Sequence, residues 1–171
     1  MTLQKKQWFA IYVRSRSEKK VGESLKEIGI ENYVPLKQEW RQWSDRKKLV
    51  ELPAISGYVF VKIAFNERLN VLNCPNVLQF VRYLGEDAVI RDVEIENLKI
   101  FLNQTDVNVE MVSGRIKLGS QVEVVEGPFI GFEGEMVQHN GKEKVVVRLD
   151  ALQSNFLVEI ESSKLTVKET C

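Results

Sequence analysis

Apolar positions follow two different periods along this 171-residue chain. Near the N-terminus, the aromatic and β-branched run from Trp8 to Val13 predicts a buried strand. A helix is expected next, because apolar residues repeat at helical spacing between a serine that suits an N-cap and a glycine that suits a C-terminal stop. These positions are Ser17, Val21, Leu25, Ile28 and Gly29. The following residues, 30–36, are expected to start a second strand.

The segment of residues 37–51 (KQEWRQWSDRKKLVE) alternates charged and aromatic residues without a stable apolar face. It predicts a long, exposed hairpin that contributes little to a core. The most continuous apolar strand of the chain follows at residues 58–63, as expected for a central strand. A short helix at residues 66–72, a strand at residues 77–83 and a helix that starts near Asp92 complete an α+β pattern.

The second half of the chain alternates apolar and polar residues with a period of two, which is typical of short half-buried strands. The stretch GSQVEVVEGPFIGFEGEMV, residues 119–137, places a turn rich in glycine and proline between two such strands. Glycines allow positive φ and close approach of two chains, and proline fixes φ for a turn. Asn140-Gly141 is a dipeptide preferred in two-residue hairpins. About five short strands are therefore expected to close a small, SH3-like β-barrel.

These patterns predict an α+β chain of two domains. Residues 1–102 would form an antiparallel sheet with flanking helices, and residues 115–169 would form the barrel. Between them, residues 103–114 are polar and without a period, which suits a linker.

The composition is that of an ordinary folded protein, with 44% apolar and 28% charged residues. The sequence lacks a run of about 20 apolar residues that would span a bilayer, and it lacks a cleavable signal pattern. We therefore expect a cytoplasmic protein without a membrane partner. Cys74 and Cys171 have no partner at metal-ligand spacing, so no metal site, disulfide or cofactor is expected.

Charge is unevenly distributed along the chain. Residues 1–50 carry 12 Lys and Arg against 6 Asp and Glu, and residues 51–171 carry 12 against 18. The first segment is therefore near +6 (12 − 6) and the remainder near −6 (12 − 18). Such asymmetry suggests that the first segment contacts nucleic acid, with simply solvated side chains as the alternative.

The sequence shows no pattern typical of a catalytic site. His139 precedes the Asn140-Gly141 turn, and GPFIGFEG lacks the lysine and hydroxyl residue of a phosphate-binding loop. The acidic residues at 92, 94 and 96 suit the start of a helix, where the macrodipole favours negative charge. We therefore expect a binding protein rather than an enzyme.

Two groups of motifs resemble the NusG family of transcription elongation factors. The stretch of residues 119–137 closely resembles the KOW motif, which also occurs in ribosomal proteins. Segments of the first domain resemble the NusG N-terminal domain in their expected order: Trp8–Tyr12, Tyr33–Pro35, Gly57–Val61, Val77–Arg82 and Gly85. The QWSDRKK hairpin and the overall length look most similar to the specialised RfaH-like and UpxY-like antiterminators of polysaccharide (capsule) operons.

The resemblance implies a monomer that binds elongating RNA polymerase, suppresses pausing or termination, and catalyses no reaction. Two alternatives are a general NusG-like factor that couples transcription to translation or termination, and a ribosome-associated KOW protein. The segment from Gly119 to Lys168 argues against the latter, because its five basic residues face eight acidic ones. An acidic barrel is poorly suited to grip RNA backbone.

The resemblance also implies two polymerase contacts. An apolar patch on the first domain would bind the clamp helices of the largest polymerase subunit, at Trp8, Tyr58, Phe60 and Phe80. A second contact, with the opposite lobe of polymerase, would involve Glu67, Arg68, Leu69 and Asn70. The alternative for each aromatic residue is a structural role, because alternate residues of a central strand face a core.

Non-template DNA in the transcription bubble would lie against the basic edge of the first helix, at Arg14, Arg16, Lys19 and Lys20. Lysines in a first helical turn oppose the macrodipole, so they suit a site where an anion is bound. The hairpin adds aromatic faces beside positive charge, the combination that binds single strands. Its candidates are Trp40, Arg41, Trp43, Arg46, Lys47 and Lys48.

For the barrel, the resemblance implies contact with ribosomal protein S10 or a termination factor, through Phe129 and Ile130 of the KOW loop. Packing across the turn is the alternative role of Phe129. One fold-switching paralogue stores this domain as a helical hairpin. Gly127-Pro128 and Gly131 favour strands instead, so a constitutive barrel is expected.

Overall fold

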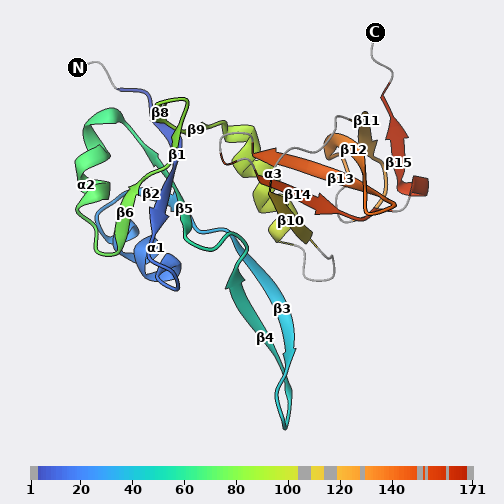
Figure 1. Ribbon diagram of the computed structural model, residues 1–171, viewed down its shortest axis with the longest axis horizontal. Helices are drawn as coiled ribbons and strands as arrows, with labels where there is room; N and C mark the ends of the chain where they lie inside the picture. Colours follow the sequence, from blue (N-terminus) through green and yellow to red (C-terminus); the bar gives the residue numbers. More distant parts are fainter. Residues whose placement is uncertain are drawn as a thin grey trace. The chain divides into compact units, whose positions relative to one another are not determined.

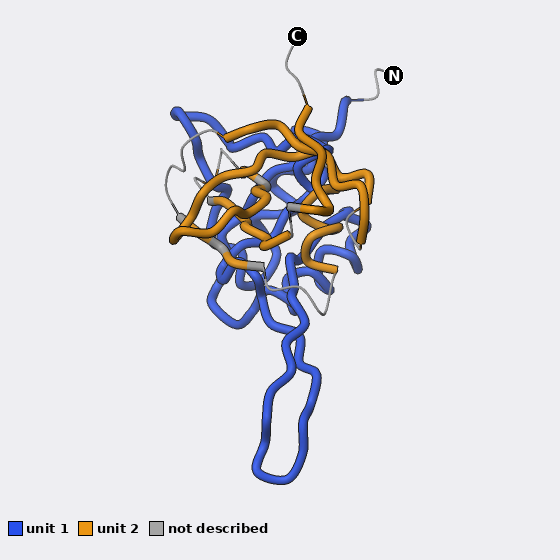
Figure 2. The backbone as a smooth tube through the Cα atoms, turned by 90° about the vertical axis from the view of Figure 1, so that its right-hand side faces the viewer, with its two compact units in different colours: residues 1–95 blue, residues 96–171 orange. Residues whose placement is uncertain are grey.

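The computed structural model describes residues 4–103, 109–113, 119–127, 130–149, 152, 154–160 and 162–168. The chain divides into two compact units, residues 1–95 and residues 96–171 (Figures 1 and 2). Each unit has its own antiparallel sheet. The mixed α/β fold class expected from the sequence is confirmed.

The sheet of unit 1 is built around the two most apolar strands of the sequence. Its strand order is β2-β5-β1-β6, with β9 also paired to β1. The bounds are β1 Gln7–Val13, β2 Glu31–Tyr33, β5 Tyr58–Ile63, β6 Val77–Phe80 and β9 Val89–Ile90. Alternate residues of β1 and β5, including Ile11, Val59 and Val61, form a core with residues of the helices that cover this face.

Helix α1 (Glu18–Glu27) packs Val21 and Leu25 into that core and ends where the sequence predicts. Gly29 has a φ of 78° and donates its N–H to the Lys26 carbonyl, while Ile30 donates to the Leu25 carbonyl. This pair of bonds is the Schellman motif, which closes helices with a residue of positive φ.

The start of α1 differs from the expected serine cap. Ser17 occupies the N-cap position, but its side chain makes no capping hydrogen bond. The Glu18 carboxylate instead accepts the Gly57 N–H at 2.8 Å, and Glu18 is only 2% exposed. Gly57 has a φ of 81°, so the glycine allows the turn that leads into β5. One buried carboxylate thereby ties α1 to the central strand.

The predicted hairpin is present as β3 (Leu36–Gln42) and β4 (Lys47–Pro53). Its pairing runs without interruption from Leu36 with Pro53 to Gln42 with Lys47. The Trp43 N–H bonds to the Arg46 carbonyl and closes the tip. Figure 2 shows the hairpin extending from the body of unit 1 as a long two-stranded arm.

The remaining elements of unit 1 are short. The turn η1 (Phe65–Glu67) leads into helix α2 (Arg68–Leu72), and strands β7 (Arg82–Tyr83) and β8 (Glu86–Asp87) form a small hairpin. Helix α3 (Asp92–Leu102) then begins within unit 1 and ends within unit 2. Its start is held by the Glu94 carboxylate, which accepts the Arg91 N–H at 2.8 Å.

Unit 2 contains a six-stranded sheet in the order β10-β14-β13-β12-β11-β15. The bounds are β10 Val109–Ser113, β11 Ser120–Val124, β12 Glu133–His139, β13 Lys142–Leu149, β14 Ser154–Val158 and β15 Leu165–Val167, with a short turn η3 at Ser162–Lys164. The sequence suggests about five strands. The additional strand, β10, lies in the polar range of residues 103–114 and pairs with β14.

The first compact unit ends at residue 95, whereas the sequence predicts that the first domain ends at residue 102. Aromatic packing explains why the second half of α3 groups with the β-rich unit. The Phe101 ring lies 4.8 Å from the Phe132 ring, centroid to centroid, and both residues are buried.

Glycines of the KOW-like stretch adopt positive φ or allow the close approach of two strands, as the sequence predicts. Gly127 and Gly131 have φ values of 95° and 84°. At Gly119, a Cβ atom would lie 1.6 Å from the Met136 carbonyl oxygen, so only glycine fits where β11 begins beside β12. Pro128 and Phe129 lie outside the described residues. Among the helices of the described ranges, none is long and apolar enough to cross a membrane.

Candidate nucleic-acid and protein interfaces

The loop between β1 and α1 and the first turn of α1 carry the first group of predicted cations. The Arg14 N–H donates to the Asn76 carbonyl at 2.9 Å, and the Ser17 N–H donates to the Arg14 carbonyl at 3.0 Å. Arg16 adopts a φ of 65°, which is uncommon for a residue with a side chain. The backbone of this loop is therefore fixed against the turn that precedes β6.

Three of the four predicted cations at this edge have no ion-pair partner among the described residues. Arg14, Arg16 and Lys20 are exposed, and no carboxylate of the described ranges lies within 4.0 Å of them. Lys19 differs, because its ammonium lies 3.4 Å from the Glu51 carboxylate of β4. We call Arg14, Arg16 and Lys20 the cationic edge. Its three charges are free to meet an anion.

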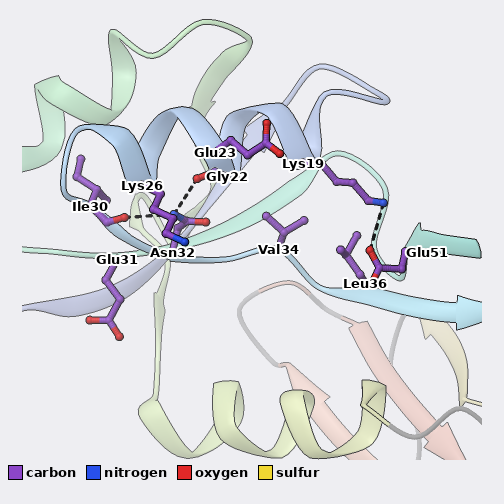
Figure 3. A pocket seen from close by; sticks show the side chains of 10 residues that line it. All are labelled: Lys19, Gly22, Glu23, Lys26, Ile30, Glu31, Asn32, Val34, Leu36 and Glu51. Atoms are coloured by element: carbon purple, nitrogen blue, oxygen red, sulfur yellow. Dashed lines mark hydrogen bonds and ion pairs between the residues drawn. The ribbon is translucent and has the colours of Figure 1, made fainter.

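A groove lies beside this edge, between α1 and the base of the hairpin (Figure 3). Its volume is about 560 Å³. Its lining carries two cations and three carboxylates, so it does not favour an anion. These charged residues are Lys19, Lys26, Glu23, Glu31 and Glu51. Asn32 also lines the groove, and its amide nitrogen donates to the carbonyls of Gly22 and Ile30.

The hairpin exposes the second group of predicted residues. The Trp40 and Trp43 side chains are 60% and 56% exposed, unusually open for tryptophan. Between residues 40 and 48, four cations face one acid, which gives a net charge of +3 (4 − 1). The cations are Arg41, Arg46, Lys47 and Lys48, and the acid is Asp45. Of the four, only Arg41 approaches a carboxylate of the described ranges, at 3.9 Å from Glu39.

The four aromatic residues predicted as one apolar patch do not share a face of the sheet. Trp8, Tyr58 and Phe60 lie on the face opposite the helices, because Trp8 pairs with Lys62 and Phe60 with Ala10. Phe80 pairs with Ile11 and belongs to the core beneath the helices. Trp8, Phe60 and Phe80 are each at most 3% exposed. Only Tyr58 is accessible, and it is half-buried.

Tyr58 forms a pair with Tyr12, which the sequence reasoning did not single out. The ring centroids are 4.8 Å apart, and the Tyr58 hydroxyl donates to the Tyr12 hydroxyl at 3.3 Å. Burial and this hydrogen bond raise the pKa of Tyr58 to about 12. Tyr33 stacks on Phe60 on the same face. The alternation of Trp8, Ala10 and Tyr12 along β1 is the signal that could have identified Tyr12.

The segment predicted for the second polymerase contact is largely engaged within unit 1. The Glu67 carboxylate accepts the Ala64 N–H at 2.8 Å and pairs with Lys6 at 3.3 Å. Arg68 forms a two-pronged bond with Asp87, at 2.7 and 3.3 Å, and its guanidinium lies 4.7 Å from the Phe80 ring centroid. The bond to Asp87 raises the pKa of Arg68. Both residues therefore stabilise local structure.

The exposed side chains of this segment are apolar or neutral. Asn70 is exposed, Leu69 is 67% exposed, and Phe65, which sequence reasoning missed, is 81% exposed. Phe65 and Leu69 stand four residues apart across η1 and α2, a spacing that places side chains on one helical face.

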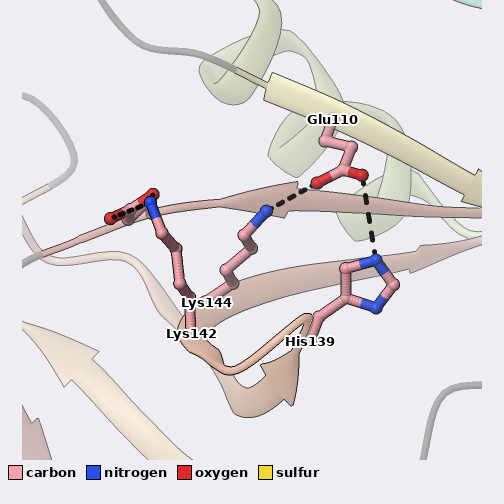
Figure 4. A network of polar contacts seen from close by, with 5 residues as sticks. Glu110, His139, Lys142 and Lys144 are labelled. Atoms are coloured by element: carbon pink, nitrogen blue, oxygen red, sulfur yellow. Dashed lines mark hydrogen bonds and ion pairs between the residues drawn. The ribbon is translucent and has the colours of Figure 1, made fainter.

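Among the described residues of unit 2, most basic side chains are paired with carboxylates. Figure 4 shows Glu110 between Lys144, at 2.5 Å, and His139, at 3.7 Å. The Lys144 bond lowers the pKa of Glu110. Three further pairs are Lys142–Glu159, Arg148–Glu135 and Lys168–Glu133. Such neutralised cations suit RNA backbone poorly. At the KOW loop, Ile130 is 68% exposed, while Phe129 lies outside the described residues.

Comparison with known proteins identifies a family match across most of unit 1. The family described as "Transcription termination factor nusG" matches residues 6–99. The chain is also similar to the protein called "Transcription termination/antitermination protein NusG" in Staphylococcus aureus strains N315 and Newman. In each case the identity is 24% over 172 residues, which covers 94% of both chains.

A solved structure gives a likeness in fold. The structure described as "Domain interaction in Thermotoga maritima NusG" matches with a TM-score of 0.53 and 22% sequence identity. The match covers 96% of this chain and 98% of that one. The similarity therefore extends over both units rather than the first alone.

Proposed function

The chain belongs to the NusG family of transcription termination factors, and from that membership we propose that it binds elongating RNA polymerase and suppresses pausing or termination. It acts through binding surfaces and catalyses no reaction. Its place of action is the cytoplasm, on polymerase that is transcribing DNA.

The cationic edge supports this proposal most directly. Arg14 and Arg16 lie in a loop whose backbone is fixed by hydrogen bonds, Lys20 lies in the first turn of α1, and no described carboxylate neutralises them. Like charges gathered without counter-ions raise the local potential and favour an anionic partner. The non-template strand of the transcription bubble has the matching charge. Lys19, held by Glu51, contributes less to this contact.

The second part of the proposal is a polymerase contact on the sheet face that carries Tyr58. An accessible tyrosine offers an apolar ring with a polar hydroxyl, which suits a protein interface. Tyr58 and its partner Tyr12 are half-buried, so their rings are reachable. We assign Trp8, Phe60 and Phe80 to the support of this domain, since all are buried. Glu67 and Arg68 stabilise local structure, so we assign the contact with the opposite lobe of polymerase to the exposed Leu69 and Asn70.

We also propose a specialised role at polysaccharide biosynthesis operons. The support is the resemblance of the QWSDRKK hairpin to the RfaH-like and UpxY-like paralogues. The alternative is a general factor, which the 94% coverage of the Staphylococcus aureus proteins favours. In either case Ile130 and the KOW loop are the contact with ribosomal protein S10 or a termination factor. The paired cations of unit 2 favour a protein partner over RNA.

Single-round transcription by purified polymerase tests the proposal. On a template with a pause site and a terminator, the protein is expected to shorten the pause and increase read-through. Tyr58→Ala should lose this effect and co-purification with polymerase, while Tyr58→Phe, which keeps the ring, should retain both. Unchanged elongation at saturating protein, with no co-purification of the wild-type chain, would contradict the proposal. Increased termination would favour the general factor.

A further inference from the structure

We propose that the hairpin formed by β3 and β4 holds one unpaired nucleotide against Trp40, with Gln42 contacting the base and Lys47 the phosphate. This inference rests on the nucleic-acid contact of the proposed function and assigns it a defined position. We call the group Trp40, Gln42 and Lys47 the nucleotide seat.

The pairing of the hairpin brings these three side chains to one face. Trp40 pairs with Leu49 and Gln42 pairs with Lys47, and residues two apart on a strand share a face. Arg41 pairs with Lys48 on the opposite face. The six residues predicted from sequence as one surface are thus divided. Only the face with Trp40 combines a large ring, an amide and an ammonium group.

A pocket marks the same position. It has a volume of about 430 Å³ and is lined by Trp40, Arg41, Gln42 and Lys47. This volume lies within the range typical of small-ligand sites, about 300–1,000 Å³. The Trp40 side chain is 60% exposed, so its ring is not used by the core. Bases stack on such rings in proteins that bind single strands.

Charge favours a nucleotide over a neutral or basic partner. The outer part of the hairpin, residues 40–48, has a net charge of +3 (4 − 1). Lys47 and the neighbouring Arg46 and Lys48 have no ion-pair partner within the described ranges. A phosphate beside the stacked base would neutralise Lys47, whereas a protein with an apolar surface would leave these cations unsatisfied.

The orientation of the Gln42 amide predicts which bases fit. Its Nε2 donates to the Trp43 carbonyl at 3.0 Å, and a carbonyl only accepts, so the amide nitrogen must face it. The Gln42 oxygen is then directed elsewhere as an acceptor. An acceptor suits the exocyclic amino groups of adenine, cytosine and guanine, whereas thymine and uracil have no exocyclic amino group and offer only the ring N3–H as a donor.

The seat is continuous with unit 1 through the base of the hairpin. Glu51 of β4 pairs with Lys19 of α1 at 3.4 Å. Trp40 is four residues beyond Leu36, the first residue of β3, which corresponds to about 13 Å at roughly 3.3 Å per residue. A single strand that meets the cationic edge therefore reaches Trp40 by following the hairpin from its base.

Fluorescence anisotropy with the full-length protein tests the seat. Labelled 12-nucleotide single strands of DNA and of RNA, each as A-, C- and T- or U-rich sequences, are titrated at one fixed salt concentration. Loss of one base stack, worth roughly 1–3 kcal/mol, corresponds to about 5- to 150-fold weaker binding for Trp40→Ala. Trp40→Phe should keep most affinity. Trp43→Ala, an equally exposed tryptophan outside the pocket lining, should change it about twofold or less.

Two further measurements separate the seat from its alternatives. Gln42→Leu should abolish the preference for A- and C-rich strands. The wild-type affinities for DNA and for RNA show which of the two nucleic acids the seat binds more tightly. Equal losses in Trp40→Ala and Trp43→Ala, or no loss in either, would overturn the seat. So would a Trp40→Ala variant that loses polymerase co-purification but binds oligonucleotides normally. If the wild-type chain fails to co-purify with polymerase, the proposed function fails, whatever the hairpin binds.

Discussion

Neutralising the cationic edge should change how the protein's affinity for single-stranded DNA depends on salt. In the variant Arg14→Gln, Arg16→Gln, Lys20→Gln, three exposed cations without a described carboxylate partner are removed. Each phosphate contact on a single strand contributes about 0.7 to the slope of log K against log salt. Three contacts should therefore account for about 2.1 of that slope (3 × 0.7).

The slope sets the size of the expected effect. Between 50 and 200 mM salt, the logarithm of the salt concentration changes by about 0.6. Multiplied by the slope difference of about 2.1, this change means that the wild-type protein should lose about 20-fold more affinity than the triple variant over this range. Anisotropy titrations at four salt concentrations measure this directly. The variant should also fold normally, because Lys20 in the first turn of α1 opposes the helix macrodipole.

The control is Lys26→Gln, which removes an exposed cation from the last turn of the same helix. Its slope should equal that of the wild type. The reasoning is refuted if the triple variant retains the wild-type slope, or if Lys26→Gln lowers the slope by about as much as one edge cation does, roughly 0.7. Thermal unfolding of each variant establishes that a lost slope reflects lost contacts rather than lost structure.

Three predictions concern stability. Phe60→Ala should lower the free energy of unfolding by about 3–5 kcal/mol, since Phe60 is fully buried, and denaturant titration should show a much smaller loss for half-buried Tyr58→Ala. Gly119→Ala should destabilise unit 2, because the new Cβ would lie 1.6 Å from a carbonyl oxygen; an unchanged melting temperature would contradict this clash. Burial raises the pKa of Glu135, but hydrogen bonds from Arg148 and the Gly119 N–H outweigh it and hold that pKa below its ordinary value. A depressed pKa in the folded state stabilises the protein above the unfolded-state pKa of about 4.3, and this stability is lost as the pH falls through the folded-state pKa. Glu135→Gln should therefore flatten the acid limb of a profile of unfolding free energy measured between pH 7 and pH 2.

Local patterns of the sequence predict the elements of this fold well. The apolar run at β1, the helical spacing that ends at Gly29, and the positive φ of Gly127 and Gly131 all follow from short-range chemistry. Strand β10 could not be predicted in the same way. Val109, Met111 and Val112 of this strand are apolar, but the surrounding range of residues 103–114 is mostly polar, and the pairing with β14 comes from a segment more than 40 residues away.

The candidate site was less predictable, because it depends on contacts between distant residues. The charges of Lys19 and Arg68 are visible in the sequence, but their partners Glu51 and Asp87 are 32 and 19 residues away. The sequence likewise shows aromatic residues in several strands without showing which face Phe80 joins. Only the register of β1 with β6 places it beneath the helices.

The sequence predicted the hairpin itself but left its two faces undivided. Alternation along β3 implies that Trp40 and Gln42 share a face, but the turn length decides which residues of β4 join them. The pairing of Gln42 with Lys47 supplies that register. The same register places Arg41 and Lys48 on the opposite face, although Arg41 also lines the pocket beside the seat.

Genome-wide crosslinking and immunoprecipitation of the tagged protein, beside polymerase, in its native cells tests the central claim most directly. The account predicts occupancy that coincides with transcribing polymerase and is concentrated on one or a few long operons. Occupancy that follows polymerase on every gene would contradict the specialised role and leave a general elongation factor. Absence of any signal linked to polymerase, with the tagged protein expressed and folded, would contradict the account as a whole.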